Sequence, residues 1–323
     1  MRIKNLSVLM TTYNCGHYIS QAITSIIKQT YKNFELIIID DGSVDDTKEV
    51  INQFNDSRIV YINKEHSGFS DSLNFGLNKA RSEWIARMDA DDISLPQRLE
   101  KQVNFLNNNS KYNIISSWYA VFNTDKVRHL FNLPQEHLEI ISALRLHSPL
   151  CHGSSLYNKK LIVDCGGYFN VPFGTDYNLW LRLGKKAIFY NIPEILILVR
   201  ARKNSLHRNL NMDTSAILLM QRKYFPAGTS NPISKSQQKE NSQIEGWREW
   251  FYGSKKESRK YWMKNYSIFK DLKIFLAFIL SFLPSKLFKF IKQLNIKARI
   301  HYLRLSKENK KELNSFISSQ SYK

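Results

Sequence analysis

Three apolar segments in the first third of the chain each run directly into a cluster of polar residues. They are Leu6–Met10 before Thr11–Asn14, Phe34–Ile39 before Asp40–Ser43, and Trp84–Met88 before Asp89–Asp92. The segments between them carry apolar residues at helical spacing, as at Ile19, Ile23 and Ile26, so strands and helices alternate. This alternation predicts an α/β fold with βαβ units and a mostly parallel sheet that is covered by helices on both faces.

The polar clusters predict a binding crevice at one edge of that sheet, because ligands of open α/β sheets bind outside the carboxyl ends of the strands. Asp89-Ala90-Asp91-Asp92 is the most acidic cluster, and its carboxylates would repel one another without a cation. Mg²⁺ and Mn²⁺ suit oxygen ligands, and Mg²⁺ typically binds through one or two carboxylates together with substrate phosphates. The alternative is a solvated acidic turn in which Asp92 caps a helix that begins near Leu95.

Several motifs, in this order, resemble those of the inverting family 2 glycosyltransferases, over residues 5–207. The motifs are the opening strand Ser7–Asn14, the segment Ile39–Ser43, the small residues Ser67, Gly68, Asn74, Gly76 and Ala80, the acidic segment Arg87–Asp92 with Pro96 and Arg98, and the helix Gly174–Leu183. The resemblance implies a Rossmann-like GT-A fold over residues 1–210. From residue 211 the sequence pattern turns helical and basic, which predicts a helical basic extension over residues 211–323. The resemblance also implies sugar transfer from a nucleotide-diphosphate sugar, in the first place a UDP-sugar, to a glycan or lipid-linked acceptor in surface polysaccharide or lipooligosaccharide assembly.

The resemblance assigns the donor to side chains at the three strand ends. The residues implied for the nucleobase pocket are Thr11, Tyr13 and Asp41, with Asp40 close by. Asp89 would face the ribose, Asp91 would hold Mn²⁺ or Mg²⁺ on the diphosphate, and Gly68 would let the backbone approach the donor closely. Arg87 and Arg98 would pair either with the acidic cluster or with the phosphates.

The acceptor side is implied by the later motif Thr175–Trp180. Inverting transfer needs a general base to take the proton of the acceptor hydroxyl, and the resemblance places Asp176 in that role. The family has Glu before this Asp, whereas Thr175 stands here. Further residues implied on the acceptor side are Gly167, Tyr168, His152 and Trp180. A late histidine of the family is also replaced, by Arg202, and a guanidinium binds phosphate but does not ligate a metal.

The excess positive charge lies in the last third of the chain. Residues 1–210 carry 25 basic and 20 acidic residues, whereas residues 211–323 carry 22 basic and 8 acidic ones. The apolar run Ile274–Leu283 precedes Lys286, Lys289 and Lys292, and it is shorter than the roughly 20 residues of a spanning helix. This pattern predicts peripheral contact with an anionic membrane surface. The alternative is a helical extension packed on the catalytic domain, and a polar linker is expected at Pro226–Gln243.

The cysteines, the amino-terminal segment and the absence of other motifs bear on the cellular compartment and on the class of protein. Cys15, Cys151 and Cys165 form no CxxC pair, and the first apolar run is too short for a secretory signal, so we expect a cytoplasmic protein on the inner face of the cell membrane. A sugar-1-phosphate nucleotidyltransferase is the main alternative enzyme, but no glycine-rich phosphate loop lies near the amino terminus. A non-enzymatic protein that binds membranes or nucleic acid would explain the charge alone, and the tail has no recognisable nucleic-acid module.

Overall fold

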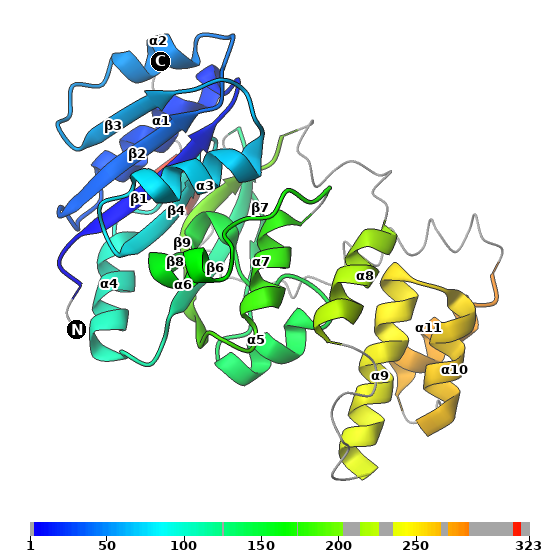
Figure 1. Ribbon diagram of the computed structural model, residues 1–323. Helices are drawn as coiled ribbons and strands as arrows, with labels where there is room; N and C mark the ends of the chain where they lie inside the picture. Colours follow the sequence, from blue (N-terminus) through cyan, green and yellow to red (C-terminus); the bar gives the residue numbers. More distant parts are fainter. Residues whose placement is uncertain are drawn as a thin grey trace.

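The computed structural model describes residues 3–124, 126–172, 174–202, 214–225, 235–265, 271–283 and 313–317. The strands are β1 Leu6–Thr12, β2 Phe34–Asp40, β3 Ile59–Asn63, β4 Trp84–Asp89, β5 Ile93–Ser94, β6 Ile114–Asn123, β7 Lys126–Phe131, β8 Leu156–Asn158 and β9 Phe189–Arg200. They form one sheet in the order β3-β2-β1-β4-β8-β6-β9-β5, with β7 paired to β6. Figure 1 shows this sheet flanked by helices, with a further group of helices beyond it.

The half of the sheet that precedes β8 is parallel throughout. β1 pairs in parallel with both β2 and β4, and β2 pairs in parallel with β3. β6 and β9 are also parallel to each other, whereas β8 and β5 run antiparallel to their neighbours. Every residue of β1 and β2 is buried, as expected for strands that are covered on both faces. The predicted α/β fold with a mostly parallel sheet is confirmed.

Helices cover the two faces of the sheet in two groups. The helices are α1 Gly16–Ile27, α2 Thr47–Asn52, α3 Phe69–Lys79, α4 Arg98–Asn108, α5 His137–Leu144, α6 Lys159–Asp164 and α7 Thr175–Leu183. Side chains alternate along β1, so Val8 faces the core shared by α1, α2 and α4, while Leu9 faces the core shared by α3, α5, α6 and α7. Gly76 lets α3 approach the sheet, because a Cβ there would stand 2.2 Å from Leu9 Cδ1.

Two details of the chain path differ from the sequence-based expectation. Helix α4 begins at Arg98 after Gln97, and Asp92 does not cap it. The Asp92 carboxylate instead accepts a hydrogen bond from the backbone N–H of Arg200. The linker predicted at Pro226–Gln243 is wrong for residues 235–243, which belong to helix α9 Lys235–Tyr252, and residues 226–234 lie outside the described part.

The tail helices are α8 Thr214–Tyr224, α9, α10 Lys255–Asn265 and α11 Leu272–Leu280. Their own core is aromatic, formed by Trp250, Phe251 and Trp262 with apolar residues of α11. The fully buried Arg248 of α9 forms an ion pair with Glu245 and donates to the backbone carbonyl of Phe225, so α9 is tied to the end of α8.

Two expectations about the tail reach beyond the described residues. The boundary expected near residue 210 and the basic stretch Lys286–Lys292 both lie outside the described ranges. Among the helices that are described, none is long and apolar enough to cross a membrane.

Candidate active site

The register of the central strands brings the three polar strand ends together. Thr11 of β1 is the partner of Asp89 on β4, and Thr12 is the partner of Asp40 on β2. The carboxyl ends of three parallel strands therefore adjoin at one edge of the sheet, as the sequence predicts. A ligand at this edge would be within reach of all three clusters.

Asp41 organises the loop that follows β3. Its carboxylate accepts hydrogen bonds from the backbone N–H groups of Ser67, at 3.0 Å, and Gly68, at 2.8 Å, and it forms an ion pair with Lys64. Burial raises the pKa of Asp41, but these hydrogen bonds outweigh burial and the net pKa is lowered. Gly68 has a φ of +99° and open space around it, so its backbone conformation favours glycine and the loop can face a ligand closely.

Tyr13 is the expected nucleobase residue with the most accessible ring. Its side chain is half-exposed, and its ring centroid lies 4.4 Å from that of His66, a residue that sequence reasoning did not identify. Thr11 is buried. Asp40 is fully buried and accepts hydrogen bonds from Tyr61 Oη and the Ser43 hydroxyl, so it holds the strand end in place.

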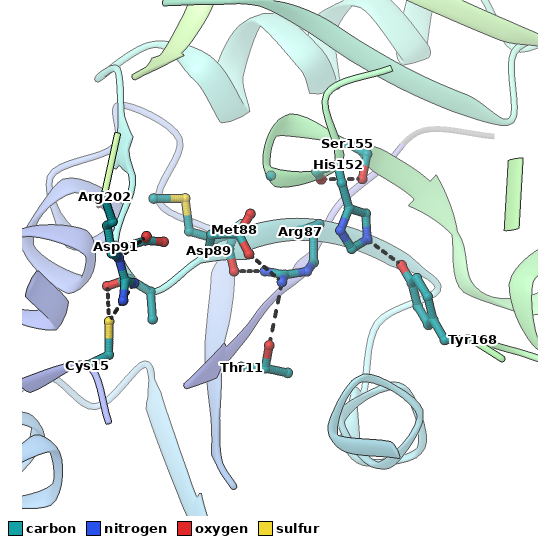
Figure 2. Close-up of polar contacts among 12 residues, drawn as sticks. Thr11, Cys15, Arg87, Met88, Asp89, Asp91, His152, Ser155, Tyr168 and Arg202 are labelled. Carbon is teal, nitrogen blue, oxygen red and sulfur yellow. Dashed lines mark hydrogen bonds and ion pairs between the residues drawn. The ribbon is translucent and has the colours of Figure 1, made fainter. Parts of the chain in front are cut away.

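Two arginines near the acidic cluster are buried, and Figure 2 shows the first of them, Arg87. Arg87 is fully buried, and its Nη2 donates to Asp89 Oδ1 at 2.7 Å. The sequence left open whether Arg87 pairs with the acidic cluster or with the donor phosphates, and in the structure it contacts the acidic cluster. Arg98 is also fully buried, but it donates to the backbone carbonyls of Gly153 and Arg87 rather than to a carboxylate, and burial lowers its pKa to about 10.

The acidic cluster receives one cation, Arg202, and one backbone N–H, that of Arg200, from the end of β9 and the residues just after it. Arg202 Nε donates to Asp91 Oδ2 at 2.5 Å, and the backbone N–H of Arg200 donates to Asp92 Oδ1 at 2.9 Å. Burial, together with the neighbouring carboxylates, raises the pKa of both Asp91 and Asp92. Local sequence did not predict these contacts, because β9 follows the cluster by about one hundred positions.

Asp176 lies in the first turn of α7, behind a left-handed Gly174 with a φ of +68°. Its side chain is half-buried, and Ser148 Oγ lies 3.5 Å from Asp176 Oδ2. The charges of Asp176 and Asp89 both act on the half-buried His152 ring. His152 is near both sides, because its ring packs against Trp180 of α7 and a Cβ on the adjoining Gly153 would stand 2.8 Å from Asp89 Oδ2.

His152 is held as a neutral side chain. Burial and the Arg87 charge lower its pKa to about 4. Its Nε2 lies 3.0 Å from Tyr168 Oη, as Figure 2 shows, and Tyr168 Oη is 2.9 Å from Tyr157 Oη. The fully buried Trp180 packs edge-on to the His152 ring. Tyr168, His152 and Trp180 thus form a packed layer beneath the expected acceptor side.

Gly167 connects this layer to α3. Its φ is +70°, and a Cβ there would stand 2.4 Å from Asn74 Oδ1. Asn74 Oδ1 accepts the backbone N–H of Tyr168, and Asn74 Nδ2 donates to the Tyr168 carbonyl. A larger residue at Gly167 would disturb this double hydrogen bond, which explains the glycine at this position.

Asp91 is the residue expected to hold a divalent cation. The described residues contain no group of three or more His, Cys, Asp or Glu side chains that could hold a metal. The Asp91 side chain is nevertheless 22% exposed, so a hard carboxylate oxygen is accessible. Mg²⁺ bound through one carboxylate takes its other ligands from phosphates and water. The site therefore suits an ion that arrives with a phosphate donor rather than one enclosed by protein ligands.

Sequence relatives identify the family. Residues 7–166 match the family described as Glycosyl transferase family 2. A Bacillus subtilis protein named as a glycosyltransferase, EpsE, is 36% identical over 211 residues, which are 63% of this chain and 75% of that protein. A Haemophilus influenzae protein named as an uncharacterized glycosyltransferase is 30% identical over 228 residues, 68% of this chain and 85% of that protein.

Solved structures share the fold at low sequence identity. TarS 1–349 of S. aureus in complex with UDP-GlcNAc has a TM-score of 0.60 at 16% identity, and the match covers 87% of this chain and 79% of that one. The mannosyltransferase PcManGT of Pyrobaculum calidifontis in complex with GDP-Man and Mn²⁺ has a TM-score of 0.57 at 15% identity, and the match covers 93% and 86%. The fold is the GT-A fold, and the chain belongs to glycosyltransferase family 2.

Proposed function

We propose that this glycosyltransferase moves a sugar, with inversion, from a nucleotide-diphosphate sugar to the hydroxyl of a glycan or lipid-linked acceptor. The observation that carries the proposal is the position of His152, whose ring packs against Trp180 of α7, the helix with Asp176 in its first turn, while a Cβ on the adjoining Gly153 would stand 2.8 Å from Asp89 Oδ2. Inverting transfer needs a leaving diphosphate on one face of the sugar and a general base on the other. A UDP-sugar is the donor to test first, and surface polysaccharide or lipooligosaccharide assembly is the proposed role.

The donor half would bind the nucleotide through three elements. Tyr13 would stack on the base beside the loop that Asp41 holds, and Asp89, fixed by the buried Arg87, would accept hydrogen bonds from the ribose hydroxyls. Asp91 would hold Mn²⁺ or Mg²⁺, which would neutralise charge on the leaving diphosphate. Thr11, buried between these elements, would fix the spacing between the base and the ribose.

The acceptor half would use Asp176 as the general base. As the acceptor oxygen forms its bond to the anomeric carbon, the bond from that carbon to the diphosphate oxygen breaks. Asp176 takes the hydroxyl proton in the same step, and Ser148 near Asp176 Oδ2 helps to orient the carboxylate. His152 holds no extra proton near neutral pH, so it does not act as the acid, and its Nε2 contacts Tyr168 Oη.

The experiment is a screen of nucleotide-sugars with mass spectrometry of the products and NMR of the new anomeric centre. Asp176→Asn keeps the size of the side chain but cannot take the proton, so kcat should fall by about 10²–10⁴-fold while UDP affinity is unchanged. Asp164→Asn, which alters an exposed carboxylate paired with Lys160, should leave kcat unchanged. Retention of configuration, or full turnover by Asp176→Asn, would contradict the proposal.

Peripheral membrane association is the localisation that we propose, on the inner face of the cell membrane. Helix α11 buries Ile274 and Ala277 in the tail core, while Leu276, Ile279 and Phe282 remain about half-exposed or more. Cations lie beside this apolar surface, since Lys255 of α10 donates to the Leu283 carbonyl and Arg259 donates to the Ser281 carbonyl. An apolar surface edged with cations suits the headgroup region of anionic lipids.

A further inference from the structure

Asp91 and Arg202 form the accessible ion pair of the acidic cluster (Figure 2). Their side chains are 22% and 29% exposed, whereas Arg87 and Asp92 are buried. A ligand in the crevice can therefore reach the Asp91–Arg202 pair without opening the core. Asp89 is 33% exposed but pairs with the fully buried Arg87, and the buried Asp92 accepts from the backbone N–H of Arg200.

The remaining contacts of Arg202 are with uncharged groups. Its Nη2 lies 3.2 Å from Cys15 Sγ, and its guanidinium carbon is 4.7 Å from the centre of the Tyr18 ring. Within the described part of the chain, Asp91 is the one carboxylate at ion-pair distance from Arg202. Moving Arg202 to another anion would thus break one ion pair and no others that involve the described residues.

A guanidinium and a divalent ion compete for one carboxylate, because each neutralises it and like charges repel strongly at a few ångströms. Under the proposed function, Asp91 holds Mn²⁺ or Mg²⁺ on the diphosphate of the donor. We propose that Arg202 is the counter-charge of Asp91 in the free enzyme and that it transfers to the diphosphate when the donor and the metal bind. The planar guanidinium suits two phosphate oxygens, so the exchange leaves both Asp91 and the diphosphate neutralised.

Two measurable consequences follow, and both rest on the proposed role of Asp91. The free enzyme binds Mn²⁺ weakly, since the ion must displace Arg202. A nucleoside diphosphate strengthens Mn²⁺ binding, because it offers Arg202 another anion, and by linkage Mn²⁺ strengthens nucleotide binding by the same factor.

The test is to titrate the full-length protein with Mn²⁺, with and without UDP, and to measure binding from the electron paramagnetic resonance signal of free Mn²⁺. Arg202→Ala should bind Mn²⁺ alone about fivefold more tightly than the unmodified protein, the effect of removing an ion pair of about 1 kcal/mol. UDP should then strengthen Mn²⁺ binding by a smaller factor. Arg202→Lys keeps the positive charge but lacks the planar guanidinium group, so the affinity of this variant for Mn²⁺ alone should stay near that of the unmodified protein.

Arg58→Ala is the matched control, because Arg58 pairs with Asp56 at 2.7 Å and the two side chains are 23% and 19% exposed. It should change neither Mn²⁺ nor UDP affinity. Arg202→Gln carries the same prediction as the alanine variant and serves if that variant does not fold. Equal Mn²⁺ affinity of the free unmodified protein and the folded variant would overturn the exchange.

Asp91→Asn separates failure of this inference from failure of the proposed function. If it abolishes UDP-dependent Mn²⁺ binding while Arg202→Ala has no effect, the metal site stands and the exchange is wrong. If the unmodified protein binds no Mn²⁺ even with saturating UDP, the metal part of the proposed function and this inference are both overturned.

Discussion

Replacing Arg87 with methionine tests whether the buried guanidinium holds the donor side together. Arg87 is fully buried, donates to Asp89 Oδ1 at 2.7 Å and also donates to the Met88 carbonyl. Removing one partner of a buried ion pair costs about 3–5 kcal/mol, because the remaining charge loses its counter-charge. Asp89 is 33% exposed and water can solvate part of its charge, so we expect the low end, about 3 kcal/mol.

The assay is thermal unfolding followed by circular dichroism. With roughly 2–4 °C per kcal/mol for a large domain, Arg87→Met should lower Tm by about 6–12 °C. Lys160→Met is the control, since it breaks an exposed pair with Asp164 on one helix and should cost about 0.5 kcal/mol or less. Adding Asp89→Leu to Arg87→Met should restore part of the loss, because no charge then remains without its partner.

The reasoning about Arg87 would be refuted by one result. If Arg87→Met and Lys160→Met had the same Tm, the buried guanidinium would contribute no more than a surface lysine. Asp89 would then be positioned by its strand alone, and the proposed link between the Arg87 contacts and ribose binding would be lost.

Three further predictions concern the donor site, pH and the membrane. Gly153→Ala should weaken UDP binding about tenfold, because its Cβ would stand 2.8 Å from Asp89 Oδ2, whereas Gly184→Ala meets nothing closer than 3.5 Å and should bind UDP normally in calorimetry. The pKa of His152 is about 4 when folded against 6.5 as the reference value, so only the unfolded chain gains this proton as the pH falls between them. The free energy of unfolding, measured with urea, should therefore fall between pH 7 and pH 4.5 for the unmodified protein. This fall should be about 2–3 kcal/mol larger than the fall for His152→Asn. Equal falls would refute the burial of a neutral ring beside Arg87, Asp176 and Asp89. Replacing Leu276, Ile279 and Phe282 together by serine should reduce co-sedimentation of the protein with phosphatidylserine vesicles. Leu138→Ser, at an exposed leucine of α5, should not reduce it. Equal sedimentation of the two variants would show that α11 does not contact lipid.

The sequence by itself was enough to predict the elements that build the donor side. β1, β2 and β4 are buried along most or all of their length, so each appears in the sequence as a continuous apolar run that ends in polar residues, whereas the helices between them show apolar residues every three to four positions. Parallel pairing then required those ends to meet, and the register of Thr11 with Asp89 confirms it. The roles assigned to Asp176, Asp91 and Tyr13 remain predictions for the experiments above.

Only the tertiary structure decided which cation pairs with the acidic cluster and which residue of α3 holds Tyr168 on the expected acceptor side. Arg202 follows Asp91 by 111 positions, and Asn74 precedes Tyr168 by 94, so neither contact leaves a periodic trace in the sequence. The same holds for His66 beside Tyr13 and for α9, which contains part of the segment whose polar composition predicts a linker. Local patterns encode which face of an element is buried, whereas the partner of a buried or half-buried charge depends on the path by which distant segments return to the sheet.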